Sequence, residues 1–383
     1  MCVVTVADLP TPAVLVEHSR LERNIQHMQA AAVAAGIALR PHAKTHKSPI
    51  VARRQIDAGA IGICCAKLGE AEVFAAAGIA DIRLPYPLQP ATAPRVLALQ
   101  RQVRRLSFIV DDLDVARGWS DAMVAAATRV DVLVKVDVGF HRCGIAPDAD
   151  SAIPFLRQVA ALPGLRLCGL LSHAGHAYHA HSDDELRAVA EDECRTMAGL
   201  ASASHDAGIG IAEVSAGATP PARFSLAVGG GTFTEYRPGN YVYFDRTMIG
   251  LGAATLDDCA LTVLATVVSA PAAGRVVLDA GSKTLAADGA RGFAATAGYG
   301  AVLREVVASA GQTPDPHLIV ERLSEEHATV RVTAGAGPLR PGDRVRVVPN
   351  HACVVSNLVD TAWLIDGPEV IGALPIAARG RIQ

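Results

Sequence analysis

The sequence predicts a (β/α)8 TIM barrel followed by a C-terminal all-β domain, and three observations support this fold class. From about residue 20 to residue 245, Ala-rich helical stretches alternate with short β-branched runs that end in polar or Gly-containing turns. Such alternation is typical of a parallel sheet whose strands are connected by helices. After residue 247 the chain becomes β-rich and loses helical periodicity. The length of 383 residues exceeds that of most single domains.

Eight strands are expected in the barrel, and helical stretches separate them. The strands cover residues 37–44, 61–67, 81–87, 106–112, 129–139, 165–175, 209–217 and 235–245. The helices lie near 19–36, 49–58, 68–78, 91–101, 114–127, 149–161 and 183–207. Eight such units fit a closed barrel. The alternative is a doubly wound open sheet, which predicts fewer strands and an early Gly-rich nucleotide loop that this sequence lacks.

The second domain is expected to be built from strands alone. We place the barrel at residues 11–246 and the β domain at 247–383, to which the N-terminal residues 1–10 are joined. The predicted β-rich segments are 260–272, 275–282, 316–334 and 343–358, with Pro and Gly turns between them.

Net charge, cysteine content and the length of the apolar runs indicate which classes of protein to expect. The formal net charge of −3 gives no general reason to expect a nucleic-acid partner or an anionic membrane. The eight cysteines form no C-x-x-C pair and are expected to be reduced thiols. The N-terminus makes a poor signal peptide, and no apolar run reaches membrane-spanning length. These features predict a cytoplasmic protein.

The segment "RPHAKTHK", Arg40 to Lys47, concentrates charge at the end of the first barrel strand. Active sites of TIM barrels lie at this end of the strands. Alternation along a strand puts Lys47 on one face and, on the other, Arg40, His42, Lys44 and His46. A lysine amine among other cations and away from water loses its proton more easily, which makes it a nucleophile toward an aldehyde. Lys44 is therefore the candidate, against the simpler interpretation of a solvated basic loop.

Other strand ends carry polar, Gly-containing motifs too. Arg142 follows the fifth strand, and "AGAT" (216–219), which contains Gly217 and Thr219, follows the seventh. Its backbone N–H groups could hold a phosphate. The eighth strand contains Arg237, Gly239 and Asn240, and the sixth ends in a turn with His173, His176, His179 and His181. Motifs of this kind at successive strand ends indicate an active site rather than ordinary loops.

The segment "PNHACVV" places His351 and Cys353 two residues apart. On a strand this spacing puts both side chains on one face, as a metal site needs. Two protein ligands leave positions open for water or substrate, which is typical of a catalytic ion. Imidazole and thiolate suit Zn²⁺ best, with Mn²⁺, Co²⁺ or Mg²⁺ as alternatives. A buried structural Cys beside a structural His is the competing interpretation.

Together these segments resemble the fold-type III (alanine-racemase-like) pyridoxal-phosphate enzymes, and most closely the group of D-threonine aldolases and D-serine dehydratases. The resemblance covers nearly the whole chain and depends most on the combination of "RPHAKTHK" with "PNHAC". "LDAGSKTL" and the final "PIAARGR" are more similar to the aldolases. Cys353 is more similar to the dehydratases, because some aldolases have Asp at this position.

The resemblance assigns roles to single residues. It implies that Lys44 forms the Schiff base with pyridoxal phosphate and that Arg237 faces the pyridine nitrogen. Arg142 would lie near cofactor and substrate, and His351 and Cys353 would bind the divalent metal. The implied phosphate contacts are Gly217, Thr219, Gly239 and Asn240. Ala218 replaces a serine that is frequent in the group, so Thr219 is expected to compensate for the missing hydroxyl.

The implied activity is that of a lyase on D-β-hydroxy-amino acids, with a homodimer as the assembly. We expect a D-threonine aldolase that forms glycine and acetaldehyde, with His176 as the base and His173 or His179 as alternatives. D-Serine dehydratase and D-3-hydroxyaspartate aldolase or dehydratase are the other possible activities. A metal-free racemase would need a tyrosine base, and after residue 247 only Tyr299 is present. A non-catalytic pyridoxal-phosphate carrier would usually lack the β domain.

Overall fold

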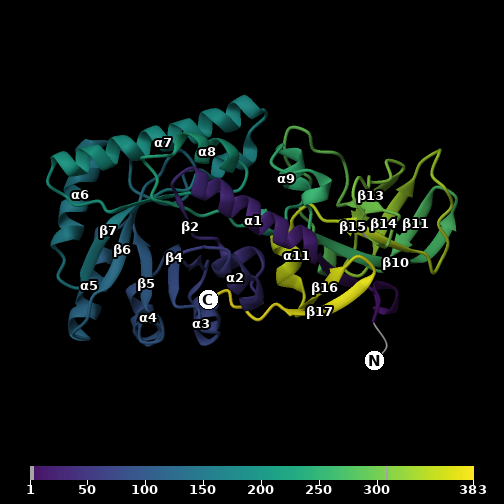
Figure 1. Cartoon of the computed structure of the whole chain (residues 1–383), viewed down its shortest axis with the longest axis horizontal. Coiled ribbons are helices and arrows are strands. Elements are labelled where there is room, and N and C mark those ends of the chain that lie inside the picture. The colour runs from purple at the N-terminus through teal and green to yellow at the C-terminus, as the bar shows by residue number, and fades with distance from the viewer. Residues whose placement is uncertain (1–3, 308) are drawn as a thin grey trace.

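The computed structural model describes residues 4–307 and 309–383 and confirms the predicted fold class. A helix-wrapped barrel and a β domain lie side by side, and the long helix α1 (His18–Ala34) runs between them (Figure 1). No helix in the described part of the chain is both long and apolar enough to cross a membrane. The seven cysteines in those ranges are free thiols, and Cys2 lies outside them.

The barrel contains all eight expected strands in one parallel sheet. Its strands are β2 (Ala38–Leu39), β3 (Ile63–Cys64), β4 (Asp81–Pro87), β5 (Arg105–Val110), β6 (Val130–Lys135), β7 (Leu165–Leu171), β8 (Glu213–Ala216) and β9 (Glu235–Tyr236). The order is β2-β9-β8-β7-β6-β5-β4-β3, and a parallel bridge between His42 and Cys64 closes the circle. The carboxyl ends of all strands therefore meet at one mouth.

Seven helices lie where the sequence predicts them, and an eighth, α8 (Ala222–Val228), was not predicted. They are α1 (His18–Ala34), α2 (Pro49–Asp57), α3 (Leu68–Ala76), α4 (Ala93–Gln100), α5 (Leu113–Ala125), α6 (Ala149–Ala161), α7 (Asp183–Asp206) and α8 (Ala222–Val228). The side chains of Asp112, Asp148 and Ser182 accept hydrogen bonds from the first turns of α5, α6 and α7. Such caps satisfy backbone N–H groups that would otherwise lack partners and fix where each helix begins.

The strand β3 covers only Ile63–Cys64 of the predicted 61–67. Two further barrel strands, β2 and β9, are also much shorter than expected, and the prediction that a strand extends through Lys44 is wrong. The chain leaves β2 after Leu39 and forms a 3₁₀ turn over Ala43–Thr45. Likewise, β9 ends at Tyr236 and a 3₁₀ turn covers Asn240–Val242. Each of β2 and β9 is followed by an Arg-Pro dipeptide, and proline has no N–H to continue a ladder.

The β domain is a nine-stranded sheet in the order β11-β14-β13-β12-β15-β10-β1-β16-β17, and β11 also pairs with β10. The strands are β1 (Ala13–Glu17), β10 (Leu261–Ala272), β11 (Arg275–Leu278), β12 (Ala301–Leu303), β13 (Leu318–Leu323), β14 (Ala328–Val332), β15 (Arg344–Val348), β16 (Thr361–Asp366) and β17 (Glu369–Pro375). Because β1 pairs with β10 and β16, residues 13–17 lie in this sheet and not in the barrel where the sequence placed them.

Short helices interrupt the β domain where only strands were expected. Besides α9 (Arg246–Gly250) and α10 (Ser282–Leu285), helix α11 covers Ala352–Leu358, inside the predicted strand 343–358. Its buried residues Ala352, Val355 and Ser356 recur every three or four positions, which is the spacing of one helix face. The Asp245 carboxylate accepts a hydrogen bond from the Ala352 N–H at 2.9 Å and so supports the start of the helix.

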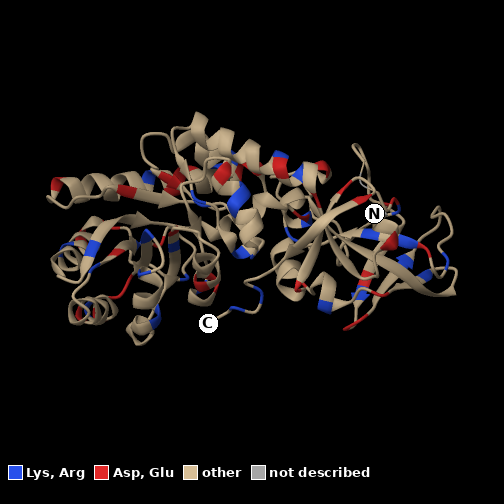
Figure 2. Ribbon diagram, turned by 60° about the horizontal axis from the view of Figure 1, so that its bottom comes forward, with Lys and Arg blue, Asp and Glu red and all other residues tan. Residues whose placement is uncertain are grey.

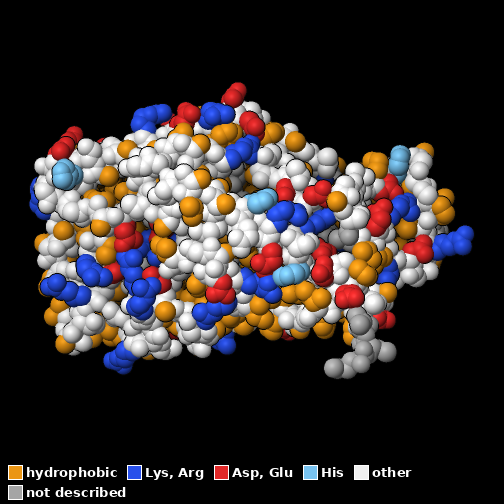
Figure 3. Space-filling model, in the orientation of Figure 1, with side chains coloured by type: hydrophobic (Ala, Val, Ile, Leu, Met, Phe, Trp, Pro, Cys, Tyr) orange, Lys and Arg blue, Asp and Glu red, His pale blue; other side chains and the backbone are white. Residues whose placement is uncertain are grey.

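Charged residues divide between the surface and the barrel interior. Acidic and basic side chains are interspersed over both domains in Figures 2 and 3, as the small net charge implies. Inside the barrel, the buried guanidinium of Arg40 donates to Glu235 and Asp81 at 2.6 Å each. The guanidinium of Arg83 donates a hydrogen bond to the carboxylate of the same Glu235 at 2.6 Å. These pairs neutralise charges that would otherwise be costly to bury.

Candidate active site

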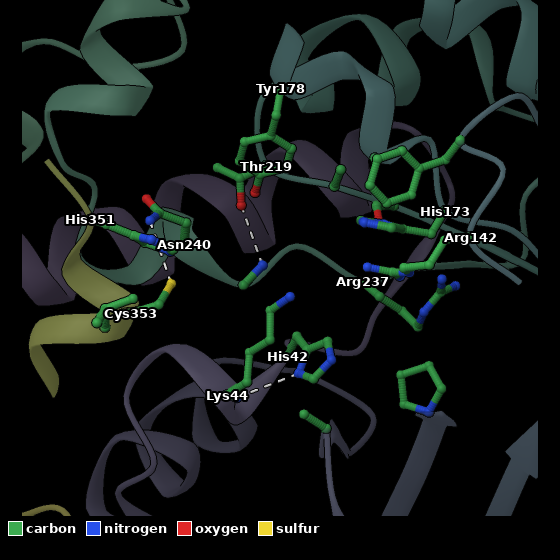
Figure 4. Close-up of a pocket in the computed structure, with 18 of the residues that line it drawn as sticks. His42, Lys44, Arg142, His173, Tyr178, Thr219, Arg237, Asn240, His351 and Cys353 are labelled. Carbon is green, nitrogen blue, oxygen red and sulfur yellow. Dashed lines mark hydrogen bonds between the residues drawn. The ribbon is translucent and has the colours of Figure 1, made fainter. Parts of the chain in front are cut away.

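A cavity of about 560 Å³ lies at the barrel mouth, between the loops after the strands and helix α11 of the β domain. Figure 4 shows side chains from both domains that converge on it. Nine of the ten residues given the main catalytic, cofactor or metal roles line it, and so do the alternative bases His173 and His179. The nine are Lys44, Arg142, Gly217, Thr219, Arg237, Gly239, Asn240, His351 and Cys353. His176 is not among the described residues that line this cavity.

Lys44 stands on the 3₁₀ turn after β2, and its side chain extends into the cavity (Figure 4). The His42 ring accepts a long hydrogen bond from the Lys44 backbone N–H at 3.4 Å and caps the turn. Burial, and next the positive charge of Lys44, hold the pKa values of both His42 and His173 well below the ordinary value. The two imidazoles beside the lysine are therefore neutral at pH 7.

The other charges of "RPHAKTHK" do not surround Lys44 as strand alternation predicted. Arg40 points into the barrel interior, and the buried His46 contacts Ser48 and lies edge-on to Phe74. Lys47, expected on the opposite face, lines the same cavity, where its amine contacts Glu70 at 3.1 Å and Asn357 at 2.7 Å. The prediction was wrong because a 3₁₀ turn distributes side chains over three directions, not two.

Arg237 lies on the cavity floor with a fixed guanidinium. It is 5 % exposed, and it donates hydrogen bonds to the Ser215 hydroxyl and the Ser172 carbonyl oxygen. Next to it, Gly217 has φ = 140°, and a Cβ there would lie 2.5 Å from the Arg237 backbone nitrogen. Only glycine allows this close approach of two strand ends. The bare backbone of Gly217 therefore lies directly beside the buried Arg237.

Thr219 joins the two loops that the sequence assigned to a phosphate. Its hydroxyl oxygen accepts hydrogen bonds from the backbone N–H groups of Gly239 and Tyr241, both at 3.3 Å. A Cβ on Gly239 would come within 3.1 Å of the Thr45 hydroxyl, so this position is also tightly packed. These bonds hold the segment after β9 against the loop 216–219, and the Thr219 hydroxyl can donate its own hydrogen to an anion.

Two further cations extend from strand β6 and its loop. Arg142 lies over the Phe140 ring, with 5.0 Å between the guanidinium carbon and the ring centre. Lys135 is 4 % exposed and donates to the Val136 carbonyl oxygen at 3.0 Å. Burial, and next the charge of Arg237, lowers the pKa of Lys135 to about 8. The sequence signal for Lys135 is its position at the carboxyl end of a barrel strand, where active-site residues lie.

The turn after β7 supplies His173, Tyr178 and His179 to the cavity. The Nδ1 atom of His173 contacts the Gly217 carbonyl oxygen at 2.9 Å, which requires a proton on Nδ1 and leaves Nε2 unprotonated. The His176 ring packs near Gly139, where a Cβ would lie 3.5 Å from it. Of the three candidate bases, His173 is thus the best placed. Tyr178 was missed although it stands in the same motif.

His351 and Cys353 meet at the opposite wall, at the start of α11 (Figure 4). A helix and not a strand brings them together. Burial raises the pKa of the Cys353 thiol, but the hydrogen bond and charge of His351, with the Thr45 hydroxyl, together lower it below the ordinary value. Conversely, burial lowers the pKa of His351, while Cys353 and nearby carboxylates raise it to about 10. Each of the two groups therefore favours the charged form of the other, and a metal bound between them would replace the proton.

Polar neighbours hold this pair in place. The Cys353 sulfur lies 3.2 Å from the Thr45 hydroxyl and 3.6 Å from the Asn240 side-chain nitrogen. Asn240 in turn donates to the buried Asp245 at 2.6 Å. His351 Nδ1 makes a short contact with Asp288. No motif pointed to Asp288, because 63 residues separate it from its partner.

The donor set at this wall is incomplete as a protein-only metal site. Within residues 4–307 and 309–383 no group of three or more His, Cys, Asp or Glu side chains could hold a metal ion. One imidazole and one thiolate that face a cavity suit an ion whose remaining positions are filled by water or substrate oxygens. This is the open coordination of a catalytic site.

Comparisons with known proteins agree with this arrangement. The family model of the alanine racemase N-terminal domain matches residues 16–247, and the serine dehydratase domain model matches residues 260–365. D-Threonine aldolase from Arthrobacter sp is 35 % identical over 379 residues, which cover 98 % of this chain and 94 % of that protein. The crystal structure of D-threonine aldolase from Filomicrobium marinum superposes with a TM-score of 0.88 at 30 % identity and covers 100 % of this chain and 99 % of the other.

A third relative has a different reaction in its name. D-Threo-3-hydroxyaspartate dehydratase from Delftia sp. (strain HT23) is 35 % identical over 361 residues, which cover 91 % of this chain and 92 % of that protein. A C353A mutant of a D-threo-3-hydroxyaspartate dehydratase, in the metal-free form, superposes with a TM-score of 0.88 at 31 % identity and covers 97 % and 98 % of the two chains. The chain therefore belongs to the alanine-racemase-like, pyridoxal-phosphate-dependent lyases, within the group of D-threonine aldolases and D-serine dehydratases.

Proposed function

We propose that Lys44 binds pyridoxal phosphate and that the cavity floor holds its ring and phosphate. The observation in favour is the combination of an amine in the cavity, a buried guanidinium at Arg237, and a glycine surface at Gly217 that any side chain would fill. Thr219, Gly239 and Asn240 would take the phosphate. When bound, the cofactor withdraws electrons from Cα of an amino acid.

We propose that His351 and Cys353 bind a divalent metal, with Zn²⁺, Mn²⁺, Co²⁺ and Mg²⁺ as candidates. The pair lies beside Asn240 and across the cavity from Arg237 (Figure 4), and the Thr45–Cys353 contact of 3.2 Å ties it to the turn that carries Lys44. A metal here would act as a Lewis acid on the β-hydroxyl of a substrate. This linkage of the two walls is the observation that carries the proposed function.

The proposed reaction is the cleavage of D-threonine into glycine and acetaldehyde. His173, neutral and with Nε2 unprotonated, would take the proton of the β-hydroxyl. The O–H electron pair forms the aldehyde carbonyl, the Cα–Cβ bond breaks toward Cα, and Cα gains a proton to give glycine. Arg142 is proposed to hold the substrate carboxylate. His176, the base favoured from sequence, does not line the cavity, so we move this role to His173.

A second candidate is the dehydration of D-serine or D-threo-3-hydroxyaspartate. Beyond Lys44 and Arg237, the cavity lining contains five further cations and a single carboxylate, Glu70. The cations are Lys47, Lys67, Lys135, Arg142 and Arg291. Such a surplus favours a substrate with two carboxylates. Cys353 also favours a dehydratase, because the chain resembles the dehydratases at this position. Here Lys44 would remove the Cα proton while the β-hydroxyl leaves as water.

One product assay separates the candidates. The purified protein with added cofactor is incubated with D-threonine, D-serine and D-threo-3-hydroxyaspartate, each with and without a chelator. Acetaldehyde with glycine supports the aldolase. Ammonia with pyruvate or oxaloacetate supports the dehydratase. Full turnover after complete metal removal would contradict the proposed metal role.

A further inference from the structure

The carboxylate of Asp288 lies against the Nδ1 edge of the His351 imidazole. Its Oδ2 makes a short hydrogen bond to His351 Nδ1. The side chains of His351 and Asp288 are 35 % and 32 % exposed, so the contact is partly shielded from water. We infer that Asp288 is a positioning residue, which fixes the ring and the tautomer of His351 so that Nε2 is the metal-binding atom. This inference depends on the proposed metal site.

Asp288 is itself held in place by the residue next to His351. The Asn350 side-chain nitrogen donates to the Asp288 carbonyl oxygen and to the Gly298 carbonyl oxygen, both at 2.9 Å. The Asn350 side-chain oxygen accepts from Arg246 at 2.7 Å. Asn350 is 2 % exposed and Arg246 is 8 % exposed, so this is a built element of the β domain. Asn350, which holds Asp288, and His351, which Asp288 contacts, are therefore neighbours in the chain.

The consequence for His351 follows from the two nitrogens of imidazole. A ring with both nitrogens free could turn over and offer either one to a metal. With a carboxylate on Nδ1, the proton of the neutral ring stays on Nδ1, and Nε2 carries the lone pair. A histidine held this way by a carboxylate is also a more basic ligand. Asp288 thus accounts for how a site with two protein ligands can hold its ion.

The test is metal affinity, measured on the full-length protein with its cofactor bound. The protein is stripped with a chelator and titrated with Zn²⁺ in competition with a chromophoric chelator. Asp288→Ala and Asp288→Asn are expected to weaken Zn²⁺ binding about 10- to 100-fold. Asp288→Glu is expected to recover part of the affinity, because it restores the carboxylate. Asp279→Asn is the matched control: this carboxylate accepts from Thr11 and Thr266 in the same domain and does not touch His351.

A spectroscopic readout separates positioning from a general loss of stability. With Co²⁺ as the probe, Asp288→Asn is expected to shift the visible ligand-field bands, while Asp279→Asn lowers thermal stability and leaves the bands unchanged. The inference is overturned if both Asp288→Ala and Asp288→Asn bind Zn²⁺ within twofold of the unmodified protein while His351→Ala abolishes binding. If His351→Ala itself keeps full affinity, the proposed metal site fails and this inference fails with it.

Discussion

The hydroxyl of Thr45 lies 3.2 Å from the sulfur of Cys353. Thr45 follows the cofactor-binding candidate Lys44 directly, and Cys353 belongs to the proposed metal pair in the other domain. Thr45 is fully buried, so the contact lies in the protein interior. This hydrogen bond, together with the Asn240–Cys353 and Lys47–Asn357 contacts, therefore couples the barrel half of the active site to the β domain.

Replacing Thr45 tests this coupling. Thr45→Val removes the hydroxyl with little change in shape, and we expect metal affinity to fall about tenfold, since a hydrogen bond to a charged group contributes roughly 1.5 kcal/mol. Thr45→Ser keeps the hydroxyl and should bind metal within threefold of the unmodified protein. Metal titration of the chelator-treated protein checks both variants. Equal affinity of Thr45→Val and the unmodified protein would show that the contact does not support the ligand.

The two lysines of the cavity are expected to behave differently toward the cofactor. Lys44→Ala should abolish the covalent adduct that borohydride reduction traps, while Lys47→Ala should retain it. The reason is that the Lys47 amine is occupied by Glu70 and Asn357, whereas no hydrogen bond or ion pair of the Lys44 amine occurs among the described residues. Mass spectrometry of the reduced protein measures the adduct. An adduct on Lys47 in the Lys44→Ala variant would overturn the assignment.

Gly217 should tolerate no side chain. Gly217→Ala places a Cβ 2.5 Å from the Arg237 nitrogen in a backbone conformation that alanine rarely adopts. We expect the free energy of unfolding to fall by about 1–3 kcal/mol, with loss of cofactor binding. Gly199→Ala is the control, because its position in α7 has nothing within 4 Å of the added Cβ. That variant should be stabilised by up to about 1 kcal/mol. Urea unfolding and cofactor titration measure both effects.

His173 and His176 offer a direct comparison of the candidate bases. His173→Asn can still contact the Gly217 carbonyl oxygen but has no basic nitrogen, so we expect kcat for substrate cleavage to fall about 10²- to 10⁴-fold. His176→Asn lies outside the cavity lining and should change kcat by less than about threefold. Steady-state kinetics with unchanged cofactor content decide the question. The reverse order of effects would restore His176 as the base.

His46 makes the fold sensitive to acid. Burial lowers its pKa to about 4, below the ordinary value of about 6.5. The unfolded chain therefore takes up the proton first, and stability is lost as the pH falls from about 6.5 toward 4, by on the order of 3 kcal/mol. His46→Asn should remove this part of the pH dependence. Urea unfolding at pH 7 and at pH 5 measures it, and identical pH slopes for the two proteins would exclude His46 as the cause.

Much of the fold could be predicted because its helices and strands follow from local sequence patterns. The alternation of helices and strands marked all eight barrel strands, and the loss of helical period after residue 247 marked the β domain. The end of β9 was overestimated because the apolar run 241–244 follows the Arg-Pro dipeptide, and the end of β2 because strand alternation was extended across Arg40-Pro41. Helix α11 was missed because Val354 and Val355 resemble a strand, and only burial shows which face is apolar.

The sequence by itself determined the barrel, its partner domain and most side chains that line the cavity, because strand ends of a barrel must meet at one mouth. Only the tertiary structure decided how the charges of "RPHAKTHK" are distributed: Arg40 into the barrel core, Lys44 into the cavity, and Lys47 onto Glu70. It alone also brought Asp288 to His351, across 63 residues. The physical reason is that periodicity reports on neighbours within a few residues, whereas partners of buried charges are chosen by the packing of elements far apart in the chain.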